Sequence, residues 1–526
     1  MIFDTLIEHG MVVDGSGAPW FRAAVGIRHG VVTLLRGDTT SCQSLRRIDA
    51  SGRIVCPGFV DTHAHSDLAL YSHPTCESKV RQGVGSEING NCGIGFAPMG
   101  QSAKQSMSHY FSGVMGRTAE TSTWTSVGQY LDAVDGKVGI NQGYMVPHGG
   151  LRLETVGWEG RSATAAEIRR MADMLRHGME DGALGLSSGL TYPPGMWAET
   201  SELIELCAVV REMGGIYATH VRYTLGDGVT DGFREAIAIS RASQVPLHIS
   251  HFYVPAVLRG DPNTMLAIID DARAQGVDVT FDAYTYEYGS STLASVLPAW
   301  AHTEGPEGLL RHLCDESFRQ RLRDEGPPKW PANRMLVAST VAPQDKECEG
   351  RMLSDIAEVR GQDVWDAIVD LLVRSDLEVS FTVETGDCND IAAFVTHDAF
   401  MVGSDSILVD GHSNPRTYGT FPRLLETYVR QRGCLSLENA IRKMTWLPAQ
   451  RFGLAERGLL RDNARADIVV FDPLTVGSSS TLSEPNVCPV GIDYVFVNGV
   501  AVLESGKLTG VTPGTVLKRK PAESCA

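Results

Sequence analysis

The sequence lacks a cluster of positive charge: Lys and Arg number 46 against 63 Asp and Glu, which gives a formal net charge of −17. Because phosphate groups are bound by clustered Lys and Arg, this balance disfavours nucleic acid and anionic membranes as partners. The one basic run, Lys518, Arg519 and Lys520, stands near the C-terminal end, where we expect a solvated tail.

Long apolar runs and paired cysteines are missing as well. No stretch approaches the roughly 20 apolar residues that a membrane-spanning helix needs. The first residues, MIFDTLIEHG, contain no basic segment followed by an apolar one, so we expect no secretory signal. The 11 cysteines include no Cys-x-x-Cys pair, and their odd number indicates reduced thiols and hence a cytoplasmic protein.

Both ends of the chain are rich in signals for short β-strands. Residues 1–56 alternate apolar and polar side chains, with His29-Gly30 between two of the runs. Residues 451–526 show the same alternation of apolar and polar side chains, and Asn498-Gly499 is a strong hairpin signal. The sequence therefore predicts that the two ends pair into one small sheet domain.

Residues 57–450 alternate strand-like and helix-like segments instead. The helical segments have good boundaries, as where Thr164 is followed three residues later by Glu167, a capping-box pattern. Eight apolar runs end at or near Asp61, Asn91, Val146, Leu186, Thr219, Ser250, Asp282 and Gly403. This alternation predicts an α/β fold of the (β/α)8 TIM-like barrel type.

The spacing fails once, between the last two of these runs, where the chain is about twice as long as a helix and two loops require. We therefore predict an insertion over about 287–345, which its prolines mark: Pro306, Pro327, Pro328 and Pro331. Segments that follow a barrel strand lie at the end where barrel enzymes build their sites, so the insertion could be a lid. A surface decoration fits the sequence equally well.

Metal-competent side chains stand at the ends of several apolar runs. His63 and His65 share one face of an extended segment and could hold one ion, although a lone His-x-His is also an ordinary polar strand end. The other strand ends supply Cys92, His220, His251 and Asp405. Because barrel strands end at one common mouth, and because imidazole and thiolate ligands suit zinc, the sequence predicts a zinc site.

Long motifs surround these residues: SKVRQGVGSEINGNCG, GALGLSSGLTYPPG, YATHVR, HISH, VGSDS and NPRTYGTFPR. In this order they resemble the D-aminoacylase (N-acyl-D-amino-acid deacylase) family of the amidohydrolase superfamily over nearly the whole chain. The resemblance implies a barrel, a β-sandwich formed by 1–56 and 451–526, and an insertion after the seventh strand. It also implies one zinc held tightly by Cys92, His220 and His251 and a weaker second position at His63, His65 and Asp405.

The activity that the resemblance implies is hydrolysis of a linear, small-molecule amide, foremost an N-acyl-D-amino acid. Zinc can lower the pKa of bound water to about 7, and we expect Asp405 to act as the general base and then the general acid. Arg416 matches the family's carboxylate-binding arginine. Tyr284, Ser290 and Tyr192 are the further expected substrate contacts. Each has a simpler alternative: Asp405 could cap a turn, and the others could be loop or packing residues.

Two departures from the family concern the substrate pocket. Tyr253 stands where many members carry a lysine that contacts substrate, and Glu287 closes a segment that reads Tyr-Pro-Tyr-Thr in the family. The first change removes a positive charge and the second adds a negative charge. Together they predict a pocket that is less suited to an anionic substrate. A larger or less acidic amide is then the alternative substrate. Arg222, close to His220 in the sequence, has no assigned role.

Other functions are compatible with the same residues. A cyclic-amide hydrolase of the hydantoinase or dihydroorotase type, or a dipeptidase, would use the same metal and differ only in its pocket. A non-catalytic barrel module would be expected to have lost ligands, and all of the expected ligands are present. The sequence leaves the acyl group, the number of metals and the oligomeric state open, a homo-oligomer included.

Overall fold

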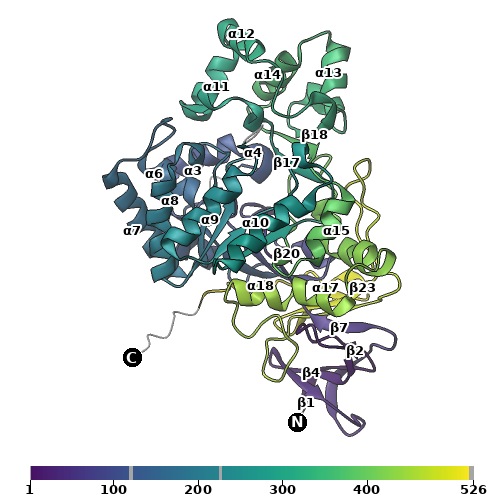
Figure 1. The fold of residues 1–526 in the computed structure, drawn as a ribbon. Coiled ribbons are helices and arrows are strands. Elements are labelled where there is room, and N and C mark those ends of the chain that lie inside the picture. The colour runs from purple at the N-terminus through teal and green to yellow at the C-terminus, as the bar shows by residue number, and fades with distance from the viewer. Residues whose placement is uncertain (1, 118–121, 224–227, 520–526) are drawn as a thin grey trace.

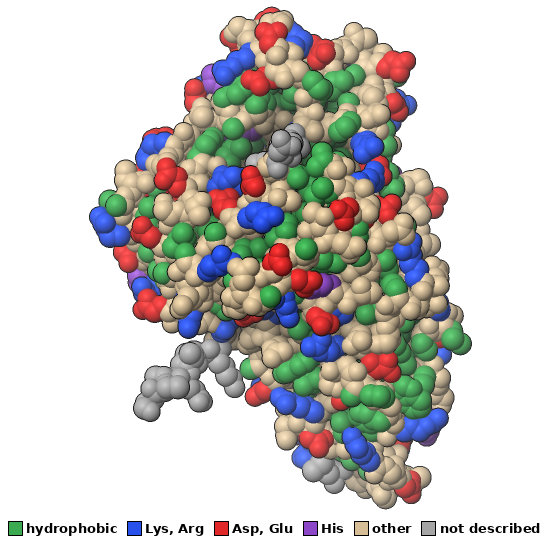
Figure 2. All heavy atoms as spheres, in the orientation of Figure 1, with side chains coloured by type: hydrophobic (Ala, Val, Ile, Leu, Met, Phe, Trp, Pro, Cys, Tyr) green, Lys and Arg blue, Asp and Glu red, His purple; other side chains and the backbone are tan. Residues whose placement is uncertain are grey.

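The structure, a computed structural model, describes residues 2–117, 122–223 and 228–519. Figure 1 shows strands from both chain ends at one extremity, alternating strands and helices in the middle, and a mainly helical part at the other extremity. On the face seen in Figure 2, Lys and Arg side chains are scattered among Asp and Glu rather than gathered in a patch. Within the described ranges, no helix combines the length and hydrophobicity needed to cross a bilayer.

The strands of the middle part pair in parallel and follow one another in chain order. They are β8 (Phe59–Asp61), β10 (Val84–Asn89), β11 (Asn141–Tyr144), β12 (Val146–Pro147), β13 (Gly185–Gly189), β14 (Ile216–His220), β15 (Leu247–Ile249), β16 (Val279–Ala283) and β20 (Phe400–Val402). Only Met145 separates β11 from β12, and the N–H of Thr62 donates to the carbonyl of Val402 (3.3 Å), which links the first strand to the last. The predicted α/β class is confirmed. The strand ends lie close to those predicted, with the largest difference at β13, which runs to Gly189 rather than Leu186.

Amphipathic helices cover these strands. α7 (Ala165–Asp181) begins with the predicted capping box of Thr164 and Glu167. Its buried face contains Ile168, Met171 and Leu175. The other helices of this part are α1 (Ala69–Ser72), α2 (Glu77–Val80), α3 (Gln101–Tyr110), α4 (Ser112–Met115), α5 (Val127–Val134), α6 (His148–Thr155), α8 (Thr200–Glu212), α9 (Asp231–Ser243), α10 (Pro262–Ala274) and α15 (Cys388–Thr396). After β20 follow α16 (Arg416–Arg423), the π-helix η8 (Leu424–Gln431), α17 (Leu437–Met444) and α18 (Trp446–Arg451).

Strands from both chain ends share one sheet. Its order is β25-β24-β23-β22-β7-β2-β3, and β22 (Ile468–Phe471) pairs antiparallel with β7 (Ile54–Pro57). The remaining members are β2 (Met11–Val12), β3 (Phe21–Arg22), β23 (Ile492–Val497), β24 (Val500–Glu504) and β25 (Lys507–Leu508). Asn498-Gly499 joins β23 to β24 as the predicted hairpin. A second sheet, β5-β4-β1-β6, contains β1 (Ile2–Glu8), β4 (Ala24–Arg28), β5 (Val31–Leu35) and β6 (Gln43–Asp49).

The segment between β16 and α15 forms a part of its own. It contains an antiparallel sheet in the order β17-β19-β18, made of β17 (Tyr288–Thr292), β18 (Met335–Thr340) and β19 (Val379–Glu384). Its helices are α11 (Gly305–Leu313), α12 (Glu316–Asp324), α13 (Leu353–Arg360) and α14 (Val364–Arg374). The part therefore continues to Glu384, past the expected limit near residue 345. No proline follows Pro343 within this part, and α14 has the amphipathic pattern of a barrel helix, so the sequence does not mark the far boundary.

Candidate active site

The six predicted metal ligands meet at the carboxyl ends of the strands. His63 and His65 follow β8, Cys92 follows β10, His220 ends β14, His251 follows β15, and Asp405 follows β20. All six side chains are buried. The short strand β9 (Ala64–His65) pairs with β21 (Ser406–Ile407), and the N–H of Asp405 donates to the carbonyl of His63 (2.8 Å), so these two ligand-bearing segments lie side by side.

Donor atoms of these side chains lie close enough to share ions. The Sγ of Cys92 is 3.2 Å from Nε2 of His63 and 3.4 Å from Nε2 of His251, and Nε2 of His65 is 3.2 Å from Oδ1 of Asp405. Three groups have donor atoms within 4.8 Å of one another: Cys92 with His220 and His251, His63 with His65 and Cys92, and His63 with His251 and Asp405. The first is the expected tight set. The expected weaker set is instead divided between the other two groups.

The chemistry of the donors fits zinc. Both ring nitrogens of His220 and Nδ1 of His65 are buried without a hydrogen-bond partner among the described residues, a costly state that a bound cation would relieve. Burial lowers the pKa of His220 to about 4, so its ring is neutral and keeps a free lone pair. Burial alone would raise the pKa of Cys92, but the charges of His63 and His251 hold that pKa well below its usual range. A thiolate together with imidazoles is a typical zinc-binding set, and a bound zinc takes the place of any proton on a coordinating ring nitrogen.

Three of the ligands adopt backbone conformations that non-glycine residues rarely use. The φ angles are 55° at Cys92, 35° at His251 and 47° at Asp405. Each residue stands two or three positions after the end of its strand, where the left-handed conformation turns the chain. Such strain persists where the surrounding structure fixes it, and it is concentrated at functional sites.

A second layer of polar groups orients the histidine rings. Asp282 accepts a hydrogen bond from the N–H of His251 (2.7 Å), and its Oδ2 lies 2.9 Å from Nε2 of His248 and 3.3 Å from Nδ1 of His63. Burial alone would raise the pKa of Asp282, but the charge of His63 keeps it below its usual range. The hydroxyl of Tyr223 lies 3.0 Å from Nδ1 of His251. Both rings are thus fixed through Nδ1, which leaves Nε2 for an ion.

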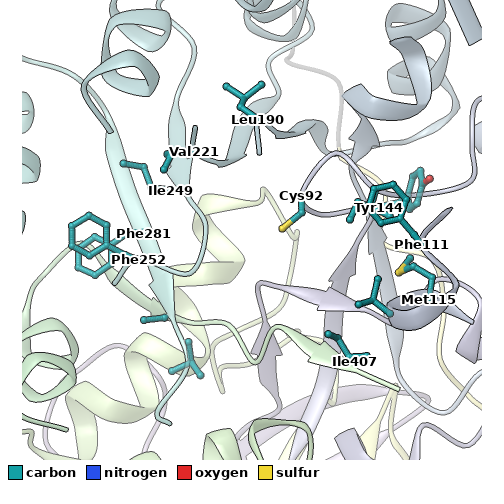
Figure 3. Packing of buried hydrophobic residues seen from close by; sticks show 14 of the residues in the cluster. Cys92, Phe111, Met115, Tyr144, Leu190, Val221, Ile249, Phe252, Phe281 and Ile407 are labelled. Carbon is teal, nitrogen blue, oxygen red and sulfur yellow. The ribbon is translucent and has the colours of Figure 1, made fainter. Parts of the chain in front are cut away.

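The cluster opens into a pocket that contains every predicted substrate contact. Figure 3 shows Cys92 among buried apolar side chains, with Leu190, Val221 and Ile249 on one side of it and Phe111, Met115 and Ile407 on the other. The predicted contacts that line the pocket are Tyr192, Tyr253, Tyr284, Ser290 and Arg416. One wall comes from the inserted part: Ser290, Ser291, Ser295, Lys329, Trp330, Phe381 and Val383. The predicted insertion therefore contributes residues to the wall of the pocket.

Arg416 is the buried cation of this pocket that lies beside the cluster. Its Nη2 is 2.8 Å from Oδ2 of Asp405, and its guanidinium carbon lies 4.4 Å from the centre of the Tyr284 ring. Arg416 and Asp405 form an ion pair without a hydrogen bond. None of the three guanidinium nitrogens of Arg416 has a hydrogen-bond partner among the described residues. Ser290 and Tyr192 are already bonded: Ser290 accepts from Asn414 (2.8 Å), and the hydroxyl of Tyr192 lies 3.0 Å from that of Ser291.

Two sequence interpretations change with the structure. Glu287 does not line the pocket, because its carboxylate pairs with Arg423 (2.9 Å), so it adds no negative charge where a substrate would bind. Arg222 supports the fold: it pairs with Glu235 (3.1 Å) and donates to the carbonyls of Met196 (2.6 Å) and Ala198 (2.8 Å).

The sequence interpretation missed three residues of the site, namely Asp282, Tyr223 and Lys329. Asp282 closes an apolar run, which predicts only a strand end, and Tyr223 follows the YATHVR motif directly. Lys329 stands in GPPKWP, where a lysine beside a tryptophan in a proline-rich insertion was an available signal.

Comparison with known proteins gives consistent results. The amidohydrolase family pattern matches residues 46–323 and 331–503. An N-acyl-D-glutamate deacylase of Alcaligenes xylosoxydans xylosoxydans is 36% identical over 519 residues, covering 98% of this chain and 96% of the relative. A D-aminoacylase of the same organism is 34% identical over 526 residues, covering 99% and 98%. The crystal structure of an N-acyl-D-glutamate deacylase from Bordetella bronchiseptica, complexed with zinc and a phosphonate inhibitor that mimics the tetrahedral intermediate, has a TM-score of 0.84 at 33% identity and covers 98% of this chain and 100% of that one. The predicted resemblance is confirmed: this chain belongs to the amidohydrolase family.

Proposed function

We propose that the protein is a zinc-dependent amidohydrolase that removes the acyl group from an N-acyl-D-amino acid. The observation that carries this proposal is the position of Asp405, which touches both the metal-competent cluster and the guanidinium of Arg416 inside one pocket. Amide hydrolysis of such a substrate needs these three elements together, because a metal, a base and a carboxylate-binding cation must act on one small molecule. The names of the relatives support the D configuration.

Cys92, His220 and His251 would hold the tightly bound zinc. The weaker second position would draw on His63, His65 and Asp405, which are divided between the other two groups, although Nε2 of His65 lies 3.2 Å from Oδ1 of Asp405. When bound, zinc polarises an amide carbonyl and lowers the pKa of water from 15.7 to about 7. Asp282 and Tyr223 keep the imidazoles turned for this purpose by contacting their Nδ1 atoms.

Asp405 is the proposed proton carrier. Burial alone would raise its pKa, but the charges of Arg416 and His63 hold that pKa well below its usual range, so the side chain is an ionised acceptor at neutral pH. It takes a proton from the attacking water as the water oxygen bonds to the acyl carbon. It then returns this proton to the nitrogen of the departing amine as the C–N bond breaks.

Arg416 is the proposed partner of the substrate carboxylate. Its unsatisfied N–H groups, buried beside Asp405, can make the two parallel hydrogen bonds that a carboxylate accepts. Tyr284 packs against the guanidinium and holds its plane, while Tyr192, Tyr253 and Ser290 shape the rest of the pocket. The rings of these tyrosines offer apolar surface to the acyl group or the side chain of the substrate.

A substrate panel tests the proposal. The purified protein, loaded with zinc, is assayed with N-acetyl-D-amino acids, their L-enantiomers, hydantoins and dipeptides. Turnover of the D series above all others is the expected result. Preferential turnover of hydantoins or dipeptides would move the protein to another activity of its family, and no turnover of any amide would overturn the proposal.

We also infer the domain division that the sequence suggested. Residues 57–450 would form a closed (β/α)8 barrel with the insertion after its seventh strand, supported by the hydrogen bond between Thr62 and Val402. Residues 1–56 and 451–526 would form a β-sandwich, supported by a shared apolar cluster that contains Ile7 and Phe496 from different sheets. A cytoplasmic location is supported by the free thiols of all the cysteines in the described ranges.

A further inference from the structure

A second cation faces the substrate pocket from the inserted part. Lys329 lies between α12 and β18 and lines the same pocket as Cys92, Asp405 and Arg416. The family pattern matches residues 46–323 and 331–503, so Lys329 falls in the gap between the two matched segments. It is therefore a feature of this chain rather than part of the pattern that its family shares.

The loop that carries Lys329 is anchored just before this residue, at Glu325 and Gly326. The indole N–H of Trp300 donates to the carboxylate of Glu325 (2.9 Å), and that of Trp365 donates to the carbonyl of Gly326 (2.6 Å). Pro327, Pro328 and Pro331 each have a fixed φ angle, which removes further freedom from the loop. The backbone that leads into Lys329 is thus fixed, and its side chain forms part of the pocket wall.

Lys329 has no carboxylate partner among the residues that the structure describes. Its Nζ lies 5.9 Å from the centre of the Trp330 ring. Burial lowers the pKa of Lys329, which reflects partial loss of solvent around a charge that no acid compensates. An ammonium group in this state binds an anion favourably, because the anion replaces the water that the ammonium has lost.

Lys329 also stands where two cavities meet. Together with Thr191, Tyr223 and Ser295 it lines a neighbouring cavity, whose other walls include Leu297, Pro298 and Trp365. A substrate that occupies the main pocket can therefore extend past Lys329. We propose that Lys329 is a second carboxylate-binding residue of the pocket, which fixes a carboxylate of the N-acyl amino acid and so determines specificity.

This inference rests on the proposed function, and its test separates the two. The variants are K329M, K329R and a matched control, K346M, which removes a lysine of the same insertion that pairs with Glu349 (2.8 Å) outside the pocket. The substrates are N-acetyl-D-methionine, N-acetyl-D-glutamate and N-acetyl-D-methioninamide, which carry one, two and no carboxylates. K329M is expected to raise KM about 10- to 100-fold for at least one acid at nearly constant kcat, as loss of a charged hydrogen bond does. K329R should restore most of the loss, and K346M should change nothing.

The pattern across substrates identifies the carboxylate. An equal rise in KM for both acids, with none for the amide, assigns Lys329 to the α-carboxylate, whereas a rise for the glutamate substrate alone assigns it to the side chain. Unchanged KM values for all three would overturn the proposal. If wild type hydrolyses none of them, the proposed function fails instead. Calorimetric binding of D-methionine and D-glutamate then still reports on Lys329, and equal affinities in wild type and K329M would overturn its role.

Discussion

The guanidinium of Arg416 lies 2.8 Å from the carboxylate of Asp405, and both groups are buried at the rim of the metal-competent cluster. This contact joins the residue expected to bind substrate to the residue expected to move the proton. A substrate carboxylate that draws N–H groups of Arg416 toward itself weakens the hold of Arg416 on Asp405. Binding the correct acid would therefore make Asp405 a stronger base when it is needed.

Replacement of Asp405 by asparagine keeps the shape and removes the proton acceptor. We expect D405N to lose turnover by about 100- to 10,000-fold, the usual contribution of a general acid–base group. The tightly held zinc should remain, because Cys92, His220 and His251 form their group without Asp405. Rates on the best substrate of the panel and zinc content by atomic absorption test both statements. A D405N protein with the rate of wild type would remove Asp405 from the mechanism.

Arg416 should control substrate binding more than zinc binding. We expect R416M to raise KM for N-acyl amino acids about 10- to 100-fold and to leave KM for the corresponding amides nearly unchanged. R423M is the matched control, since Arg423 pairs with Glu287 outside the pocket. Steady-state kinetics of the two variants compare them directly. Equal effects of both replacements would indicate general disturbance rather than loss of a carboxylate contact.

The ligand cluster could be predicted because parallel strands bring their carboxyl ends together, so that residues far apart in the sequence meet without any knowledge of their loops. His220 and His251 needed only their place after an apolar run. Asp282 closed such a run as well, but its role depends on the contact with His63, which lies 219 positions away. Sequence position alone does not separate a ligand from the group that orients it.

Charges near the pocket were less predictable, because side chains on long loops reach partners that no local pattern reveals. Glu287 is next to pocket residues in the sequence, yet Arg423, 136 positions later, turns its carboxylate away. Lys329 enters the pocket from an insertion whose far boundary the sequence did not mark. The expectation that Glu287 adds a negative charge to the pocket was therefore wrong. The expectation that Tyr253 leaves the pocket with one positive charge fewer stays a prediction.

Cys92 should be essential for tight zinc binding. We expect C92S to weaken zinc binding by about 100-fold or more, since loss even of groups that only orient the ligands costs about 10- to 100-fold. C207S is the matched control, because Cys207 is equally buried in α8 but belongs to none of the ligand groups. Competition with a chromophoric chelator measures the affinities. Equal zinc affinity in the two variants would contradict the assignment of Cys92.

Glu202, which belongs to none of the ligand groups, should make stability depend on pH. Burial alone would raise its pKa, but hydrogen bonding to His148 and the charges of His148 and Arg152 hold it below its usual value. The carboxylate therefore stabilises the folded state above its unfolded pKa, and this stabilisation is lost as the pH falls through the folded pKa. Urea unfolding from about pH 5 down to about pH 3, the range below the unfolded pKa, should show a shallower decline in E202Q, which is already less stable at pH 7 by about 3 kcal/mol.

Lys79 should hold the two ligand-bearing segments in register. Its ammonium lies 2.5 Å from Asp61 and 3.2 Å from Glu87, and all three side chains are fully buried. Asp61 in turn accepts from the backbone N–H groups of His63 (3.2 Å) and Ser404 (2.8 Å), which begin the segments that carry His65 and Asp405.

We expect K79M to leave two buried carboxylates without their cation and to destabilise the fold by about 3–5 kcal/mol. At temperatures where the variant is still folded, the loss of zinc affinity should be larger for the weaker position than for the set of Cys92, His220 and His251, because Asp61 supports only the former. Urea unfolding and stepwise zinc titration measure the two effects separately. A K79M protein as stable as wild type would show that Asp61 and Glu87 are neutralised by protonation, so that Lys79 is dispensable for placing Asp405.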